Sequence, residues 1–268
     1  MNRRFAPFVA PVVASIALAG ILVLAACTTT VPETGRQQVN FLTPAKEASL
    51  GLSEFKKIKE SKKISTNPAH NAVVQRVGAR LSKVMPVPNA EWEFVVFEDS
   101  TPNAFALPGG KVGVHSGLFE VTQNEAGLAA VIGHEVAHVV ARHSGERLSR
   151  GVVSSAAVAG AGYMMNRDGE SNKLATAALG AGALVMTQGH SRKQELEADQ
   201  MGTLFMARAG YDPREAVELW KRFAAWREKS GEGGATPAFL RSHPLDDQRI
   251  AELERYLPIA LAEYDGGR

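Results

Sequence analysis

The sequence predicts an α+β fold that is mainly helical, with one small β-sheet beside a central helix. Apolar residues recur at helical spacing over most of the chain, whereas the β-prone stretches are short and fall between residues 91 and 115. A length of 268 residues with 45% hydrophobic content is enough to bury a core. The 30 basic residues nearly balance the 28 acidic ones, so we expect no nucleic-acid partner.

The first 26 residues have the pattern of an export signal, in which two arginines precede an apolar run from Phe5 to Ala26. The run ends in Leu-Ala-Ala before Cys27, the only cysteine of the chain, and this ending resembles the lipobox of bacterial lipoproteins. The resemblance implies cleavage before Cys27 and lipidation of that residue. The alternative is a retained signal anchor, because about 20 apolar residues can span a bilayer. Thr28 stands where Asp would favour inner-membrane retention, so we expect a periplasmic protein on the outer membrane of a Gram-negative bacterium.

Residues 28–38 are polar and contain Pro and Gly, which predicts a tether between the lipid anchor and the folded part. We therefore divide the chain into a signal peptide (1–26), a lipidated cysteine with its tether (27–40) and a single folded domain (41–260).

Two amphipathic helices are predicted next, over residues 44–63 and 70–84. The apolar stripe that we expect on the first of them consists of Leu50, Leu52, Phe55 and Ile58.

Three short strands follow, over residues 91–98, 103–107 and 111–115, the last two joined by a turn at residues 108–110. The edge of this sheet could pair with an extended peptide. A plain core hairpin is the alternative.

The central helix is predicted from Asn124, its N-cap, to about His143, and it contains the sequence His134-Glu-Val-Ala-His138. Residues four apart lie on one helix face, so both imidazoles can bind one Zn²⁺ while Glu135 acts on water. A helix that merely carries two histidines is the alternative. His143 lies off the ligand face and is expected to be a helix-end residue.

Two Ala/Gly-rich stretches, residues 151–165 and 174–186, come next. We expect a close-packed helical hairpin, and the alternative is a cover over the site or a segment that touches a membrane or a membrane-protein substrate.

A further helix begins near residue 189 and places Glu195 and Asp199 on one face, with Glu197 facing elsewhere. A zinc site with two His ligands needs a carboxylate from a second helix, and a ligating His usually donates its other N–H to a carboxylate. Glu195 and Asp199 suit these two roles, unless the charged run is only a solvated surface.

Three segments together resemble the HtpX and CAAX-endopeptidase type of zinc metallopeptidase. They are Asn103-Ala-Phe-Ala-Leu-Pro-Gly-Gly110, His134-Glu-Val-Ala-His138 and Ser191-Arg-Lys-Gln-Glu-Leu-Glu-Ala-Asp199. The resemblance implies His134, His138 and Glu195 as zinc ligands, Glu135 as catalytic base and Asp199 as a partner of the ligands. It also implies that the strand around residues 103–107 pairs with substrate, with Asn103, Ala104, Phe105 and Ala106 as the binding residues. The pattern Glu-x-x-x-Asp selects Glu195 over Glu197.

His243-Pro244 followed by Arg249 is similar to a family element near the zinc. The resemblance implies that His243 and Arg249 stabilise the oxyanion of the transition state. Alternatively, His243 occupies the open zinc position in a resting state.

The combined expectation is an endopeptidase with one Zn²⁺ per chain that cleaves periplasmic or outer-membrane proteins, in protein quality control. The alternative is an assembly factor or chaperone that acts mainly by binding outer-membrane proteins.

Overall fold

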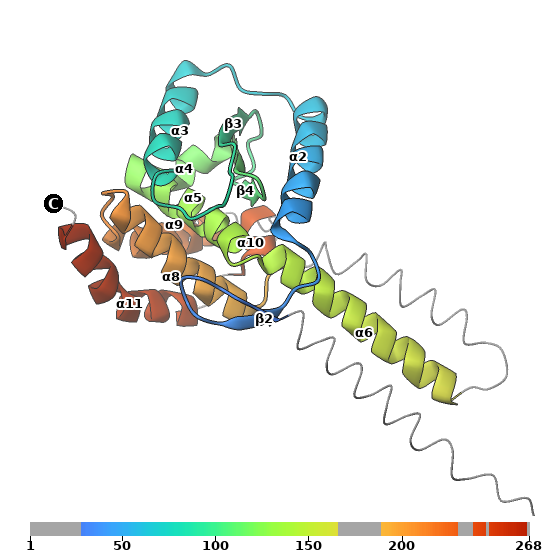
Figure 1. Ribbon diagram of the computed structural model, residues 1–268. Coiled ribbons are helices and arrows are strands. Elements are labelled where there is room, and N and C mark those ends of the chain that lie inside the picture. The colour runs from blue at the N-terminus through green and yellow to red at the C-terminus, as the bar shows by residue number, and fades with distance from the viewer. Residues whose placement is uncertain (1–27, 166–188, 230–237, 245–246, 267–268) are drawn as a thin grey trace, which may run out of the picture.

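The computed structural model describes residues 28–165, 189–229, 238–244 and 247–266 (Figure 1). The predicted signal peptide, Cys27 and the second Ala/Gly-rich stretch lie outside the described residues. The described chain is mainly helical with two small sheets, which confirms the predicted fold class.

The helices are α2 (Pro44–Ser61), α3 (Pro68–Leu81), α4 (Phe119–Thr122), α5 (Glu125–Val140), α6 (His143–Met165), α8 (Arg192–Arg208), α9 (Arg214–Lys229), α10 (Ala238–Ser242) and α11 (Asp247–Gly266). The strands are β1 (Thr28–Thr30), β2 (Gln37–Val39), β3 (Glu93–Phe97), β4 (Ala104–Leu107) and β5 (Lys111–His115), and a 3-10 turn, η1 (Ser116–Leu118), follows β5. Within the described residues, none of the helices is long and apolar enough to cross a membrane.

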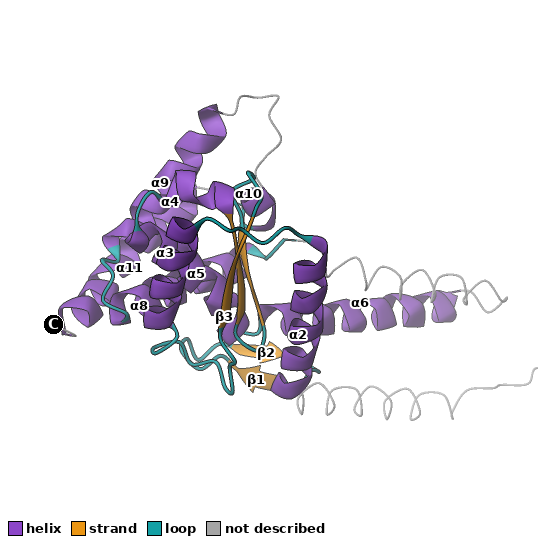
Figure 2. Cartoon of the chain, turned by 90° about the horizontal axis from the view of Figure 1, so that it is seen from above, coloured by secondary structure: helices purple, strands orange, loops and turns teal. Residues whose placement is uncertain are grey.

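The three-stranded sheet has the order β3-β5-β4, with β3 parallel and β4 antiparallel to the central strand β5. All five residues of β5 are buried, and β4 is an edge strand that packs on α5. Figure 2 shows the sheet between α2 on one side and α3 and α5 on the other. The edge strand therefore lies directly beside the helix that carries the histidine motif.

The prediction that Leu50 and Leu52 lie on the buried face of α2 is wrong. Phe55 is 1% exposed, but Leu50 and Leu52 are 45% and 42% exposed. The buried face is instead formed by Glu47, Gly51 and Phe55, each four residues apart. Gly51 packs so closely on the backbone of Pro108 that a Cβ there would lie 2.2 Å from the Pro108 carbonyl oxygen. This close backbone contact determines which face of α2 is buried. The spacing of apolar residues in the sequence does not indicate contacts of this kind.

The central helix begins as predicted, because the side chain of Asn124 accepts a hydrogen bond from Gly127 N. It ends earlier, at Val140, and His143 starts α6 instead of ending α5. Between the helices, Arg142 takes a left-handed conformation with φ 56°. Its guanidinium holds this turn by donating hydrogen bonds to Glu47 and to the carbonyl of Leu42.

The segment expected to be a tether forms an antiparallel hairpin, in which Thr28 to Thr30 pair with Gln37 to Val39. We call residues Thr28–Val39 the N-terminal hairpin. Val31 within it is 1% exposed, and Gln38 Nε2 donates a 2.8 Å hydrogen bond to the carbonyl of Ala141. The chain is therefore folded against the domain from its first described residue.

Two glycines permit an unusually close contact between α5 and α8. A Cβ at Gly133 would lie 2.8 Å from Gly202 O, and a Cβ at Gly202 would lie 2.6 Å from His134 N. Neither distance is compatible with a side chain, so the backbones meet at the residue that opens the histidine motif. This contact brings the acidic face of α8 within reach of that motif.

We expect Gly202→Ala to push α8 away from α5 and to lower the free energy of unfolding by about 1–3 kcal/mol, measured by urea denaturation. Gly266→Ala is the matched control, because nothing lies within 4 Å of a Cβ built there. The control should change stability by less than about 0.5 kcal/mol. Equal stability of the two variants would contradict the proposed role of the close contact.

Candidate metal site

Helices α5 and α8 bring His134, His138 and Glu195 together in the core. The Nε2 atoms of the two histidines lie 3.1 Å apart. Glu195 Oε2 lies 3.4 Å from His134 Nε2, and Glu195 Oε1 lies 3.6 Å from His138 Nε2. His243, directly after α10, adds its Nδ1 at 3.2 Å from His134 Nε2 and 3.0 Å from Glu195 Oε1. All four side chains are buried.

The chemistry of these four donors fits a divalent cation. Ligand atoms around a tetrahedral Zn²⁺ lie about 3.3–3.7 Å apart, and the observed separations are close to this range. His134 and His138 each direct Nδ1 at another group, so in their neutral forms both Nε2 lone pairs point at one centre. Facing lone pairs at 3.1 Å repel unless a proton or a metal ion lies between them.

The pKa of His134 agrees with this requirement. Burial alone would lower that pKa, but the hydrogen bonds and negative charges of Asp199 and Glu195 raise it to about 9. The two carboxylates thus favour a positive charge at this ring, which either a proton or a bound metal ion would supply. The pKa of Glu195 is held well below its ordinary value, because His243 and His134 outweigh the effect of burial.

Asp199 and Arg249 form a rigid support behind the cluster. Asp199 Oδ1 lies 2.9 Å from His134 Nδ1, and the Arg249 guanidinium donates two 2.8 Å hydrogen bonds to the Asp199 carboxylate. Its third nitrogen lies 2.9 Å from Glu195 Oε2, and its cation stacks 4.0 Å from the Trp220 ring. Arg249 is 1% exposed. Its nitrogens are thus occupied by the partners of the histidines, and the predicted oxyanion role for Arg249 stays a prediction.

Glu135 lies beside the four donors, with Oε1 3.2 Å from His243 Nε2. Burial raises the pKa of Glu135, and the charges of His243 and His134 offset this only in part. The backbone of Ala106 in β4 also lowers the pKa of this carboxyl group, against the effect of burial. A buried carboxyl group with a raised pKa is suited to take up and release a proton.

The residues expected to meet a substrate lie in or next to β4. Asn103 precedes the strand, and Ala104, Phe105 and Ala106 are its first three residues. The Phe105 ring packs against Phe55, and Ala104 is 2% exposed. Because these side chains take part in packing, a peptide at this edge would pair with the backbone of β4.

The sequence does not predict a second group of residues, which lies behind His138 and includes the buried His143 and Glu197 and the half-buried His190. His143 Nδ1 lies 2.7 Å from His138 Nδ1, and His143 Nε2 lies 2.8 Å from Glu197 Oε2. The His190 ring stacks on that of His138 with 3.7 Å between centroids. Glu197 faces away from Glu195, as expected, but it is buried. The one signal of this group in the sequence is Glu197, a second acidic residue on the helix that carries Glu195.

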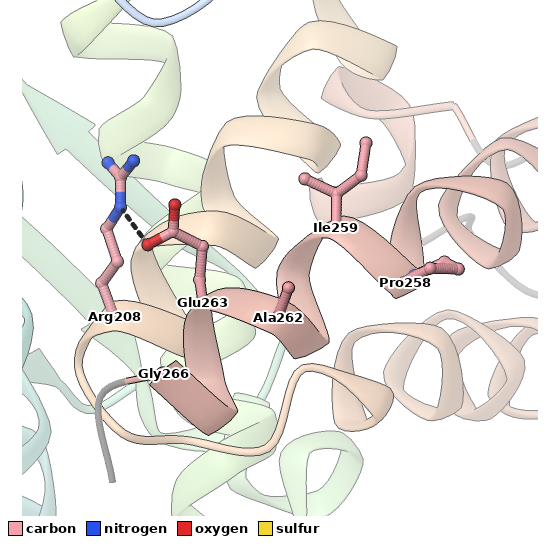
Figure 3. A pocket seen from close by; sticks show the side chains of 6 residues that line it. All are labelled: Arg208, Pro258, Ile259, Ala262, Glu263 and Gly266. Atoms are coloured by element: carbon pink, nitrogen blue, oxygen red, sulfur yellow. Dashed lines mark hydrogen bonds and ion pairs between the residues drawn. The ribbon is translucent and has the colours of Figure 1, made fainter.

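An open hollow lies at the other end of α8, between Arg208 and the part of α11 that follows Pro258 (Figure 3). Arg208 donates a 3.3 Å hydrogen bond to Glu263 there. Arg208 lies thirteen positions after Glu195 on this helix, which corresponds to about 20 Å at 1.5 Å per residue. The hollow is therefore separate from the histidine cluster.

Comparison with known proteins identifies the family. Residues 68–257, which include α3 to α11 up to its middle and all the site residues above, match the sequence profile of Peptidase family M48. The chain belongs to this family. The predicted resemblance is confirmed at this level, and membership supports a hydrolase of the metalloprotease class.

Several proteins are similar to this chain over most of its length. Mitochondrial metalloendopeptidase OMA1 of Schizosaccharomyces pombe is 35% identical over 234 residues, which are 86% of this chain and 66% of that protein. The putative beta-barrel assembly-enhancing protease of Vibrio cholerae is 29% identical over 241 residues, 87% of this chain and 49% of that protein. The beta-barrel assembly-enhancing protease of Escherichia coli is 26% identical over 233 residues, 83% of this chain and 46% of that protein.

The chain spans about half to two thirds of the length of these relatives. These relatives are named as OMA1 and as assembly-enhancing proteases, and none of the three is named HtpX. The likeness to HtpX and the membership in a lipoprotein branch therefore stay predictions.

We expect Arg249→Leu to lower the free energy of unfolding of the metal-free protein by about 3–5 kcal/mol, because it leaves Asp199 and Glu195 as buried carboxylates without their cation. Arg255→Leu, on the exposed side of α11 with a 70% exposed side chain, is the control. Its change should stay below about 1 kcal/mol. A small loss for Arg249→Leu would show that this guanidinium does not stabilise the two carboxylates.

Proposed function

We propose that this protein is an endopeptidase dependent on one Zn²⁺ per chain, held by His134, His138 and Glu195. The observation that carries the proposal is the convergence of these three donors with the carboxyl group of Glu135 beside them. The three donors come from two helices whose contact is fixed by packing, so the ligand geometry is formed before a metal arrives.

Zinc would supply Lewis-acid polarisation of the scissile carbonyl and of the attacking water. Glu135 then takes a proton from that water and afterwards delivers it to the leaving amine. Asp199 Oδ1 lies 2.9 Å from His134 Nδ1. Its negative charge favours the tautomer with the hydrogen on Nδ1, which leaves Nε2 free for a metal. Arg249 holds Asp199 and Glu195 in place, and the burial of the cluster keeps bulk water away.

The position of β4 supports an extended peptide as the substrate. The strand is one edge of the sheet, and the backbone of its Ala106 is near enough to Glu135 to lower the pKa of that carboxyl group. A peptide that adds to this edge would run past the general base with its backbone aligned. In this proposal the segment Asn103, Ala104, Phe105 and Ala106 binds substrate through the backbone groups that face away from β5.

His243 decides whether the site is open. In the described conformation it supplies a fourth donor and contacts Glu135, which leaves no position for a substrate carbonyl. We propose that this is a resting state and that His243 must move before cleavage. A site permanently closed by four protein ligands would instead be structural.

We place the protein in the periplasm, anchored to the outer membrane by lipid on Cys27, with periplasmic or outer-membrane proteins as substrates in quality control. The signal-like N-terminus and the names of the bacterial relatives support this location and substrate class. The fungal relatives are mitochondrial by name, so the location rests on the N-terminal pattern of this chain.

An assembly factor that acts mainly by binding outer-membrane proteins is the second candidate. The closed state of the site favours it, because binding at the β4 edge does not require cleavage.

We expect Glu135→Gln to bind zinc normally, measured by mass spectrometry of bound metal, and to lose peptidase activity by about 100- to 10,000-fold. Glu125→Gln, on the exposed first turn of the same helix, is the matched control and should keep full activity. Outer-membrane proteins captured by the Glu135→Gln variant would identify substrates. Full rescue of a deletion strain by that variant would favour the binding function over proteolysis.

We expect His243→Ala to keep zinc on the three remaining ligands and to cleave an unfolded protein faster than the unaltered chain. The increase should be about tenfold or more, because the open state of a closed site is a minority of about 10% or less. A loss of activity instead would indicate that His243 stabilises the oxyanion.

A further inference from the structure

We propose that His143, Glu197 and Arg36 form a positioning relay that orients the His138 imidazole toward the metal, and that the N-terminal hairpin is therefore part of the site. The inference rests on the proposed zinc site. It assigns a role to residues that the peptidase mechanism itself does not use.

The hydrogen-bond directions in the relay agree with one tautomer at each position. If His138 binds metal through Nε2, its Nδ1 carries the hydrogen and donates it to His143 Nδ1 at 2.7 Å. His143 then carries its own hydrogen on Nε2, which donates to Glu197 Oε2 at 2.8 Å. The carboxylate at the end of the chain thus fixes the tautomers of both histidines.

Burial makes this chain of hydrogen bonds specific. His143 is completely buried, and the side chain of Glu197 is 6% exposed. Water has little access to replace either bond, and an unpaired polar group at these positions would cost free energy. The His138 ring is further confined by the stacked ring of His190.

The N-terminal hairpin holds Glu197 in place. Arg36 Nε donates a 2.8 Å hydrogen bond to Glu197 Oε2, and Thr34 Oγ1 donates one to Glu197 Oε1. The other two guanidinium nitrogens of Arg36 each lie 3.1 Å from a carboxylate oxygen of Glu146 in α6. Arg36 thereby joins α6, α8 and the hairpin, which lies beside the start of α6 (Figure 1).

The relay has a parallel on the other ligand. His134 is supported by the carboxylate of Asp199, which is held in turn by Arg249. His138 is supported through His143 by the carboxylate of Glu197, which is held by Arg36. Each imidazole thus has a buried carboxylate behind it, and each carboxylate has an arginine. Partners of this kind fix the orientation and the basicity of a ligating histidine.

The relay predicts weaker metal binding when any part of it is removed. In His143→Leu we expect the zinc dissociation constant, measured by competition with a chelator, to rise about 10- to 100-fold. His143→Asn should recover part of this affinity, because its Oδ1 can still accept the hydrogen of His138 Nδ1. Arg36→Gln should raise the dissociation constant less than His143→Leu does. The visible spectrum of the cobalt-substituted protein should change in the same order, since it reports ligand geometry.

Glu33→Gln is the matched control, because Glu33 ties the same hairpin to Arg208 at 3.3 Å without touching the relay. It should leave both the dissociation constant and the cobalt spectrum unchanged. Thermal unfolding of each metal-free variant separates loss of metal affinity from loss of fold. If His143→Leu does not fold, Arg36→Gln and Thr34→Val test the same relay from the hairpin.

Unchanged zinc affinity and an unchanged cobalt spectrum in the folded relay variants would overturn the proposal. So would an equal effect of Glu33→Gln and Arg36→Gln, because the hairpin would then act only through stability. Failure of the unaltered protein to bind zinc would instead overturn the proposed function, so the two failures are distinguishable.

Discussion

The close contact of α5 with α8 is the constraint on which the rest of the site depends. A His pair on one helix offers two donors, and the third has to come from a backbone close enough for a short carboxylate side chain to reach them. Gly133 and Gly202 allow that approach, since any Cβ at either position would meet the opposite backbone. The acidic residues of α8 then lie opposite the motif, with Glu195 against the Nε2 atoms and Asp199 against Nδ1 of His134.

Charge balance explains why so many ionisable groups are tolerated in this core. Two ionised carboxylates, Glu195 and Asp199, face the single guanidinium of Arg249, which leaves one negative charge. Ionised Glu135 adds a second negative charge, and a divalent cation among neutral histidines would cancel both. Isolated buried charges are strongly unfavourable, so these carboxylates need either a divalent cation or protons on His134 and Glu135, whose pKa values are both raised.

The sequence predicted the parts of the structure that depend on spacing within one element. The strands, the N-cap of α5 and the shared face of Glu195 and Asp199 follow from local periodicity and turn chemistry. It did not predict contacts that depend on how elements meet. The inward face of α2 is set by Gly51 against Pro108, and His143 is redirected by the left-handed turn at Arg142.

Local sequence patterns do not predict contacts between distant elements, and for this reason the sequence predicts a tether where the N-terminal hairpin lies. Its composition is polar, and polar residues in a short segment usually remain in solvent. Here Arg36 and Gln38 instead bond to groups on α6, on α8 and at the end of α5, and these partners are more than 100 residues away in the chain. No periodicity within eleven residues can report such partners.

The two arginines that hold the carboxylates behind His134 and His138 come from opposite ends of the described chain. Arg36 lies near its beginning and Arg249 near its end, while the motif that they support lies midway. A metal site completed in this way cannot reach its final geometry until both ends have docked on the central helices. Binding free energy is then gained only by the fully folded domain, so metal would stabilise the hairpin and α11 together. Protection of backbone amides in β2 and α11 should therefore rise together when zinc is added. If zinc protected only α5 and α8, the support of the histidines would be local and the ends of the chain would be independent of the site.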